Sequence, residues 1–225
     1  DLKTKKSRTA HAIIGVTPAD RVHILHLRTH AGMDYPTICN LIMKDHAAYG
    51  AGAMASDFGG GQVYLQMFRQ HPLFDARRHV IFDYSGVINV ACKPMADTTL
   101  QNAFVLNRTE SISGLILAII SGQLLCFDWQ ECKEELREFL NCFRILTEKS
   151  TGENRFRYIK HGAKADDCMH AVNFVYMLLR LVTNQELIQD PGAALNIRNA
   201  VYGGSNATHG ASASPMVAAL RGYAD

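Results

Sequence analysis

The chain has 225 residues, of which 48% are hydrophobic and 20% are charged, and this composition excludes a disordered or fibrous protein. Its net charge of +2 is too small to indicate a polyanion partner from the total alone. No apolar run reaches the length of a membrane span, and the opening residues are too polar for a signal peptide. We therefore expect a soluble cytosolic protein without a membrane partner.

The six cysteines show neither a CxxC pair nor a Cys/His spacing suited to zinc. They are expected to be small core residues in a reducing compartment. No internal repeat is visible.

The first part of the chain predicts alternating strands and helices. A Thr-Pro-Ala-Asp turn joins the first two strands into a hairpin, and a Tyr-Pro pair begins the first helix. The expected elements are strands over 10–16 and 21–28, a helix within 34–48, a strand over 52–56 and a helix over 62–70.

The second part continues this pattern and ends in a polar, small-residue region. The expected elements are strands over 79–84 and 87–92, a helix over 107–121, a strand over 124–127, a helix over 128–147, a strand over 156–160 and a helix beginning near 166. From about residue 189 the pattern fades. We therefore predict one mixed α/β domain over 1–189, with a mixed sheet flanked by helices, and a flexible tail over 190–225.

Asp57 follows a predicted strand and precedes the run Phe58-Gly59-Gly60-Gly61. This run matches neither the GxGxxG spacing nor the phosphate loop of nucleotide-binding proteins. In α/β sheets, however, chemistry is placed at the carboxyl ends of strands. The position of Asp57 suits a metal or a polar ligand, and ordinary turn chemistry stays open as the alternative.

Asp166 and Asp167 stand at the start of a helix whose following turns are apolar on one stripe. One aspartate there would cap the helix and complement its dipole. A second carboxylate, with His170 one turn later, makes a cluster that suits a hard cation with oxygen ligands. Capping and catalysis both stay open at this point.

The order of the motifs resembles that of the nuclease domain of the large terminase subunit, the motor protein that packages the DNA of tailed phages. That domain has a ribonuclease H-like fold. The matching stretches are Met54-Ala55-Ser56-Asp57-Phe58-Gly59-Gly60-Gly61, Leu106-Asn107-Arg108-Thr109-Glu110, Ser121-Gly122-Gln123-Leu124 and Ala165-Asp166-Asp167-Cys168-Met169-His170-Ala171-Val172-Asn173. The resemblance covers roughly residues 9–183.

This resemblance implies an endonuclease that cuts concatemeric viral DNA by two-metal phosphodiester hydrolysis. Asp57 would match the acid of the fourth strand, and Asp166 or Asp167 the acid of the late helix, with Asp167 favoured. Two Mg²⁺ or Mn²⁺ ions held by carboxylates would activate water and stabilise the leaving oxygen. His170 would orient water or a phosphate, or be structural.

The chain departs from this family at its start, because the first strand and its acid are not visible. The strand over 10–16 looks like the family's second, and Asp1 would lie in the loop before it. We therefore expect a fragment of a larger protein whose packaging ATPase lies upstream. The resemblance further implies double-stranded DNA, the portal and the small terminase subunit as partners, in the host cytoplasm.

Basic residues near the predicted active face are expected to contact DNA phosphates without reading sequence. They are Lys3, Lys5, Lys6 and Arg8. A solvated loop is the alternative for this segment. Arg108 is a further possible phosphate ligand, or a residue that builds the start of its helix.

Two other functions stay open. One is another ribonuclease H-like nuclease, such as a resolvase, which would prefer branched to linear DNA. The other is a non-catalytic module that docks onto a packaging motor, in which the acids only cap helices.

Overall fold

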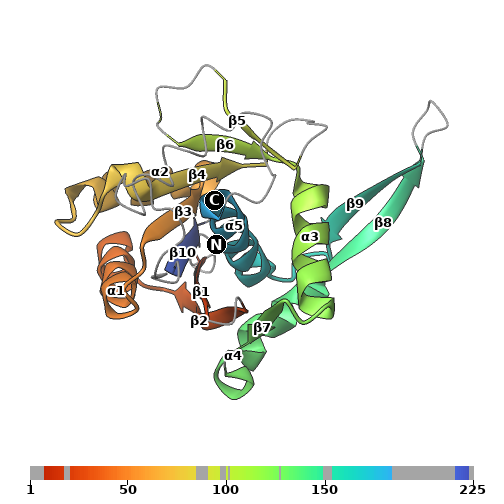
Figure 1. Cartoon of the computed structure of the whole chain (residues 1–225), viewed down its shortest axis with the longest axis horizontal. Helices are drawn as coiled ribbons and strands as arrows, with labels where there is room; N and C mark the ends of the chain where they lie inside the picture. The colour runs from red at the N-terminus through yellow and green to blue at the C-terminus, as the bar shows by residue number, and fades with distance from the viewer. Residues whose placement is uncertain are drawn as a thin grey trace, which may run out of the picture.

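The computed structural model describes residues 8–17, 21–84, 91–96, 100, 102–126, 128–148, 154–183 and 216–222. The sheet has eight strands in the order β5-β6-β4-β3-β10-β1-β2-β7 (Figure 1). Their bounds are β1 Arg8–Val16, β2 Val22–Ala31, β3 Ala53–Asp57, β4 His79–Asp83, β5 Cys92–Pro94, β6 Ala103–Leu106, β7 Leu124–Cys126 and β10 Met216–Gly222.

Parallel and antiparallel pairs both occur in this sheet. β10, β3, β4 and β6 run parallel to one another, whereas β1 is antiparallel to both β10 and β2. Helices cover the sheet: α1 Tyr35–Ala48, α2 Phe58–Gln70, α3 Arg108–Ile120, α4 Trp129–Leu136 and α5 Asp167–Val182. The predicted α/β class, a mixed sheet flanked by helices, is confirmed.

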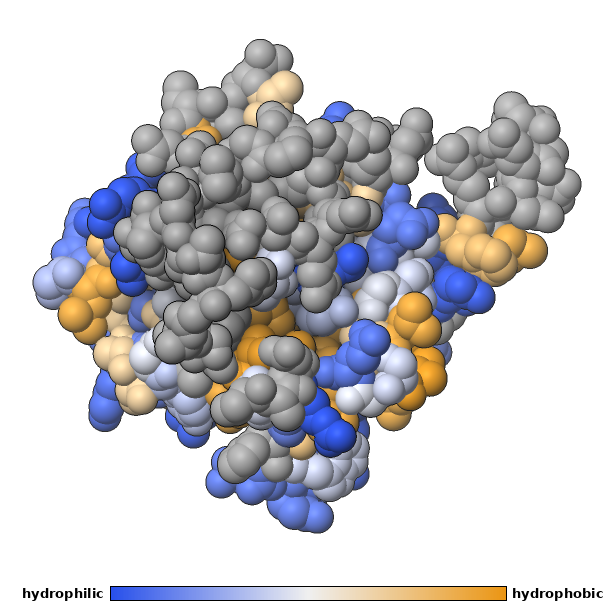
Figure 2. Space-filling model, viewed as in Figure 1, coloured by the Kyte–Doolittle hydropathy of each residue, from blue (hydrophilic) through white to orange (hydrophobic). Residues whose placement is uncertain are grey.

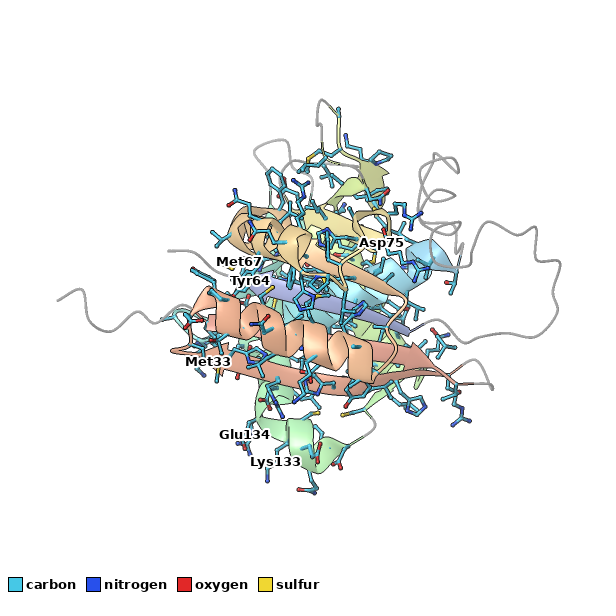
Figure 3. The ribbon with its side chains drawn as sticks, turned by 90° about the vertical axis from the view of Figure 1, so that its left-hand side faces the viewer. Met33, Tyr64, Met67, Asp75, Lys133 and Glu134 are labelled. Atoms are coloured by element: carbon cyan, nitrogen blue, oxygen red, sulfur yellow. The ribbon has the colours of Figure 1, made fainter. Side chains whose placement is uncertain are left out.

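Helices α1 and α2 lie side by side over one face of the sheet (Figure 3). Asp34 caps α1 by accepting a hydrogen bond from the Thr37 amide, and Pro36 takes an early position where no amide is needed. Tyr64 and Phe68 of α2 are fully buried against α1. α2 begins at Phe58, directly after β3, and therefore earlier than the sequence predicts.

Helix α5 covers the opposite face and is the centre of the main core (Figure 1). Every residue of α5 except Arg180 is buried. A helix that is apolar on nearly all sides belongs inside a protein. Within the part of the chain that the structure describes, no helix combines the length and apolar character needed to cross a bilayer.

The predicted helix over 128–147 is wrong beyond its first turns. α4 ends at Leu136, a short 3₁₀ helix covers Arg137–Asn141, and strand β8 covers Cys142–Glu148. β8 pairs with β9, Asn154–Lys160, in an antiparallel hairpin that projects from the body (Figure 1). The alternation of aromatic and branched side chains in both segments favours a strand pair over a helix.

Strand β10 lies in the segment for which the sequence predicts a flexible tail. Residues 216–222 read Met-Val-Ala-Ala-Leu-Arg-Gly, a short apolar run of the kind that fills a central strand. The other residues of that segment, 190–215 and 223–225, lie outside the described residues. Most of the predicted strand over 87–92 also lies outside the described residues. The sequence analysis did not predict strand β6.

Each of the six cysteines is described, and no disulfide joins any of them. Five are buried. They are therefore core residues, as the sequence predicts.

Candidate functional site

Two strands that lie side by side both end in an aspartate. Asp57 is the last residue of β3 and Asp83 the last residue of β4, and in the parallel register Asp57 pairs with Phe82. Both aspartates therefore lie at the same edge of the sheet, where the carboxyl ends of parallel strands meet, with Asp57 on the face of Phe82 and α5 and Asp83 on the opposite face. The sequence analysis found Asp57 and missed Asp83, although both follow a run of buried residues.

The start of α5 reaches this same edge. Asp167 Oδ2 lies 4.0 Å from Nη1 of Arg8, the first residue of β1. That end of β1 pairs with the end of β10, which runs parallel to β3. Tyr84, the residue after Asp83, contacts His170 on the first turns of α5. We call Asp57, Asp83, Asp166 and Asp167 the acid edge.

Asp166 is almost completely buried and is surrounded by cationic groups. Its Oδ1 lies 3.5 Å from Lys160 Nζ, and its Oδ2 lies 3.6 Å from Arg108 Nη2. Both basic side chains are about one-third exposed, so they bridge the carboxylate and the surface. A buried carboxylate needs such compensation, because its removal from water is costly.

The explanation of the two aspartates as helix caps does not hold for Asp166, whose side chain makes no capping hydrogen bond. Glu138, from the 3₁₀ helix before β8, supplies the cap instead. Its Oε2 accepts a hydrogen bond of 2.9 Å from the Cys168 amide, and its Oε1 pairs with Arg8. Asn141 fixes the same corner by donating to the Ala165 carbonyl.

His170 belongs to a buried chain of hydrogen bonds along α5. Its Nε2 lies 3.1 Å from Asp166 Oδ2, and its Nδ1 lies 3.1 Å from the Tyr84 hydroxyl. Asn173 donates to that hydroxyl at 2.7 Å, and Arg108 Nη2 lies 3.3 Å from His170 Nε2. His170 is fully buried and therefore contacts Asp166, Tyr84 and Arg108 rather than solvent.

The predicted DNA contacts divide into two groups. Lys3, Lys5 and Lys6 lie outside the described residues. Arg8 lies at the edge, where it pairs with Glu138 and approaches Asp167. Arg108 begins α3, pairs with Asp166 and lies over the Tyr84 ring at 5.8 Å.

The acid edge is an open arrangement. Among the described residues, its carboxylates do not form a group of three whose oxygen atoms all lie within 4.8 Å of one another. Mg²⁺ and Mn²⁺ keep several water ligands and take one or two carboxylates each, so they do not require a group of three.

A tighter group of possible metal ligands, missed by the sequence analysis, lies elsewhere: His11, His26 and Asp45. These residues are far apart in the sequence and have none of the short spacings typical of zinc sites. Two histidines four residues apart, His26 and His30, are the only local signal.

Comparison of the chain with models of protein families, with curated proteins and with solved structures finds no match.

Proposed function

We propose that this protein is a divalent-metal-dependent endonuclease with a ribonuclease H-like arrangement of strands, and that it cuts double-stranded viral DNA during genome packaging. The observation that carries the proposal is the acid edge. Asp57 and Asp83 end adjoining parallel strands, and the start of α5 brings Asp167 to the same place. Carboxylates from two strand ends and a buried helix form a donor set for hard cations.

Within this proposal, Asp57 and Asp167 hold the cations from the α5 face of the sheet and Asp83 holds them from the opposite face, and two Mg²⁺ or Mn²⁺ ions are expected. When bound, such ions activate the attacking water and stabilise the leaving oxygen of a phosphodiester. Asp166 has a different role, because Lys160, Arg108 and His170 already surround it. It orients these groups toward the edge and keeps the start of α5 in place.

The proposed site differs from that of the terminase nuclease family mainly in the origin of one carboxylate. In that family, one acid comes from the first strand. In this chain β10 lies beside β1, where that strand is expected, and its sequence Met-Val-Ala-Ala-Leu-Arg-Gly carries no carboxylate. Asp83 is the acid of this edge that we propose in its place.

DNA would approach along the β8–β9 hairpin, which ends beside the acid edge at Lys160. The middle of the hairpin carries exposed Arg144 and Arg157, and the Arg144 guanidinium lies 4.1 Å from the centre of the exposed Phe156 ring. Guanidinium groups neutralise phosphates, and binding of this kind weakens as salt rises. An ATPase domain, a portal and a small terminase subunit remain the expected partners of such a nuclease.

The test is the cleavage of supercoiled plasmid in Mn²⁺ by the wild-type chain and by Asp57→Asn, Asp83→Asn and Asp34→Asn. We expect both edge variants to lose at least about 100-fold in rate, since each removes a proposed metal ligand. Asp34→Asn is the matched control, because Asn caps a helix as well as Asp and this exposed residue lies at the start of α1. EDTA should abolish all cleavage.

Equal activity of Asp57→Asn and wild type would contradict the assignment. Absence of both cleavage and Mn²⁺ binding would reject the nuclease and favour the docking module. A strong preference for branched over linear DNA would keep the chemistry but replace the packaging role with that of a resolvase.

A further inference from the structure

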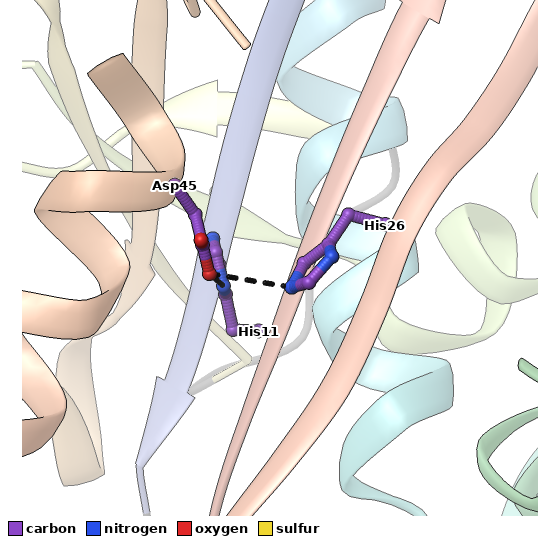
Figure 4. Close-up of side chains that lie close together, drawn as sticks. All are labelled: His11, His26 and Asp45. Atoms are coloured by element: carbon purple, nitrogen blue, oxygen red, sulfur yellow. Dashed lines mark ion pairs between the residues drawn. The ribbon is translucent and has the colours of Figure 1, made fainter. Parts of the chain in front are cut away.

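A second group of ligand-type side chains lies on the sheet face opposite α5. His11 of β1, His26 of β2 and Asp45 of α1 converge there, and we call these three residues the histidine cluster (Figure 4). Asp45 Oδ2 lies 3.4 Å from His26 Nε2 and 3.8 Å from His11 Nδ1. The cluster joins three elements under α1 and shares no residue with the acid edge.

The strand register explains how the two histidines meet. His26 pairs with Ile13, so it lies diagonally across the strand pair from His11. Side chains in this relation are within reach when they are long or aromatic. The two rings lie 5.2 Å apart between centroids, and a β-bulge follows at once between Ile13 and Ile14. α1 then places Asp45 over both rings.

The cluster contains polar atoms that the described residues leave unsatisfied. His11 is fully buried, and neither of its ring nitrogens has a hydrogen-bond partner among the described residues. The same is true of His26 Nε2 and Asp45 Oδ2, two of the atoms that face each other. Buried polar groups are almost always satisfied, because each one without a partner costs free energy. This arrangement points to a ligand.

The imidazoles present lone pairs to such a ligand. Burial lowers the pKa of His11 well below its ordinary value, and neighbouring histidines and Arg28 add to the effect. Burial also lowers the pKa of His26, although Asp45 opposes it. Both rings are therefore neutral at pH 7, which is the form that binds metals. Neutral rings also leave the charge of Asp45 without compensation from an ion pair.

We propose that the histidine cluster is a binding site for a transition-metal cation, with Zn²⁺ as the best fit. Zinc takes imidazole nitrogen and carboxylate oxygen at about 2.0–2.2 Å in a tetrahedron, so its ligand atoms lie about 3.4 Å apart. The separations of 3.4 and 3.8 Å from Asp45 Oδ2 match this geometry closely. Imidazole ligands select against Mg²⁺, the ion suited to the acid edge.

Three protein ligands leave a fourth position in the tetrahedron. His30 is a candidate for this fourth ligand. Its ring stacks with that of His11 at a centroid distance of 6.3 Å, and its Nε2 has no hydrogen-bond partner among the described residues. Water fills the position if His30 stays where it is. Arg28, across the strand from His11, is exposed, so its charge lies in solvent and its repulsion of a cation is screened.

Co²⁺ is the probe, because its absorption bands are intense in a tetrahedral site and weak in an octahedral one. The wild-type chain, in excess Mg²⁺ to occupy the acid edge, should bind one Co²⁺ with a tetrahedral spectrum, and Zn²⁺ should displace it. His26→Gln and Asp45→Asn should each weaken this binding by more than about 100-fold, the upper limit for the loss of an outer-shell partner. His71→Gln and Asp34→Asn, which lie outside both sites, should bind as wild type does.

Saturating Zn²⁺ should also raise the melting temperature of wild type by about 5 °C or more, and leave that of His26→Gln unchanged. Far-UV circular dichroism in EDTA checks that each variant is folded. If His26→Gln is not folded, Asp45→Asn is used as the cluster variant in its place. An octahedral or absent Co²⁺ spectrum in wild type, or unchanged binding in both cluster variants, would overturn the proposal. Neither readout depends on cleavage of DNA, so failure of the nuclease leaves this test intact.

Discussion

The acid edge and the histidine cluster both bury titratable groups in one small protein, but the neighbours of those groups differ. At the edge, Asp166 is 1% exposed and lies within 4 Å of Lys160, Arg108 and His170. In the cluster, His11 is 0% exposed and has no hydrogen-bond partner among the described residues. The chain itself compensates the charge of Asp166, whereas the polar atoms of the histidine cluster depend on a ligand in our proposal.

Outside the grey residues, the face of the molecule in Figure 2 has hydrophilic and hydrophobic residues interspersed. Exposed hydrophobic side chains include Leu117 and Ile120 of α3 and Phe156 of the hairpin.

The largest expected effect is that of acid on the buried histidines. Burial lowers the pKa of His79 to about 3 and that of His11 well below 6.5. The unfolded chain binds more protons than the folded one below pH 6.5, so stability that is complete above that value is lost as pH falls. Between pH 7 and pH 5, His79 should cost about 2 kcal/mol of unfolding free energy, and His11 should add to this loss.

Urea unfolding in EDTA at the two pH values measures this loss directly. His79→Gln should make the loss smaller by about 2 kcal/mol, since it removes one of the two titrating groups. Equal stability at pH 5 and pH 7 would mean that the folded chain takes up as many protons as the unfolded chain over this range, so that burial does not lower the pKa of these rings. His11 would then be protonated beside Asp45 at pH 5, and the contrast between the two regions would disappear.

The next largest effect on stability is expected from removing the charge of Glu138, which holds the start of α5. Glu138→Gln should lower the unfolding free energy by about 3 kcal/mol, because Arg8 loses its carboxylate partner and the Cys168 amide loses a charged cap. Chemical denaturation at pH 7 is the measurement. The exposed Glu134→Gln, whose partner Arg137 is also exposed, is the control and should change stability by less than about 1 kcal/mol.

A smaller loss is expected when Asp166 is made neutral. Asp166→Asn should cost about 2 kcal/mol, since water can reach the partly exposed Lys160 and Arg108 once their partner is gone. Differential scanning calorimetry would detect the change. A gain in stability would show that the ion pairs cost more in desolvation than they return, and would leave positioning as the only reason for this carboxylate.

The smallest effect is expected in the histidine cluster without metal. Asp45→Asn in EDTA should change the unfolding free energy by only about 0.5 kcal/mol, because Asp45 is partly exposed and faces neutral rings. The same thermal or urea measurement, repeated with Zn²⁺, separates a structural role from a ligand role. A loss above about 2 kcal/mol without metal would assign Asp45 to the fold alone.

How far the sequence predicts this structure depends on the distance over which each signal acts. Local signals succeed: Pro36 and Asp34 mark the start of α1, and the apolar stripe after Asp167 marks α5. The acids Asp57 and Asp167 were found because each adjoins a recognisable element. Asp83 was missed, because its importance depends on the pairing of β4 with β3 and not on its own neighbours.

Tertiary pairing also explains the remaining failures. β8 has apolar residues at helical spacing with those of α4, yet it forms a hairpin because β9 offers a partner. Glu138 caps a helix that begins about thirty residues later, and such a contact has no local signature. His11, His26 and Asp45 come together only when two strands and a helix are assembled.

The position of β10 gives this chain an unusual order of assembly. In the sheet, β10 separates β5-β6-β4-β3 from β1-β2-β7, and it pairs Thr9 with Gly222. During synthesis on a ribosome, the edges of β1 and β3 that face β10 therefore stay unpaired until the residues up to Gly222 have emerged. Contacts over such sequence distances form slowly. The nascent protein thus presents two open strand edges, which is the state that chaperones recognise and that aggregation exploits.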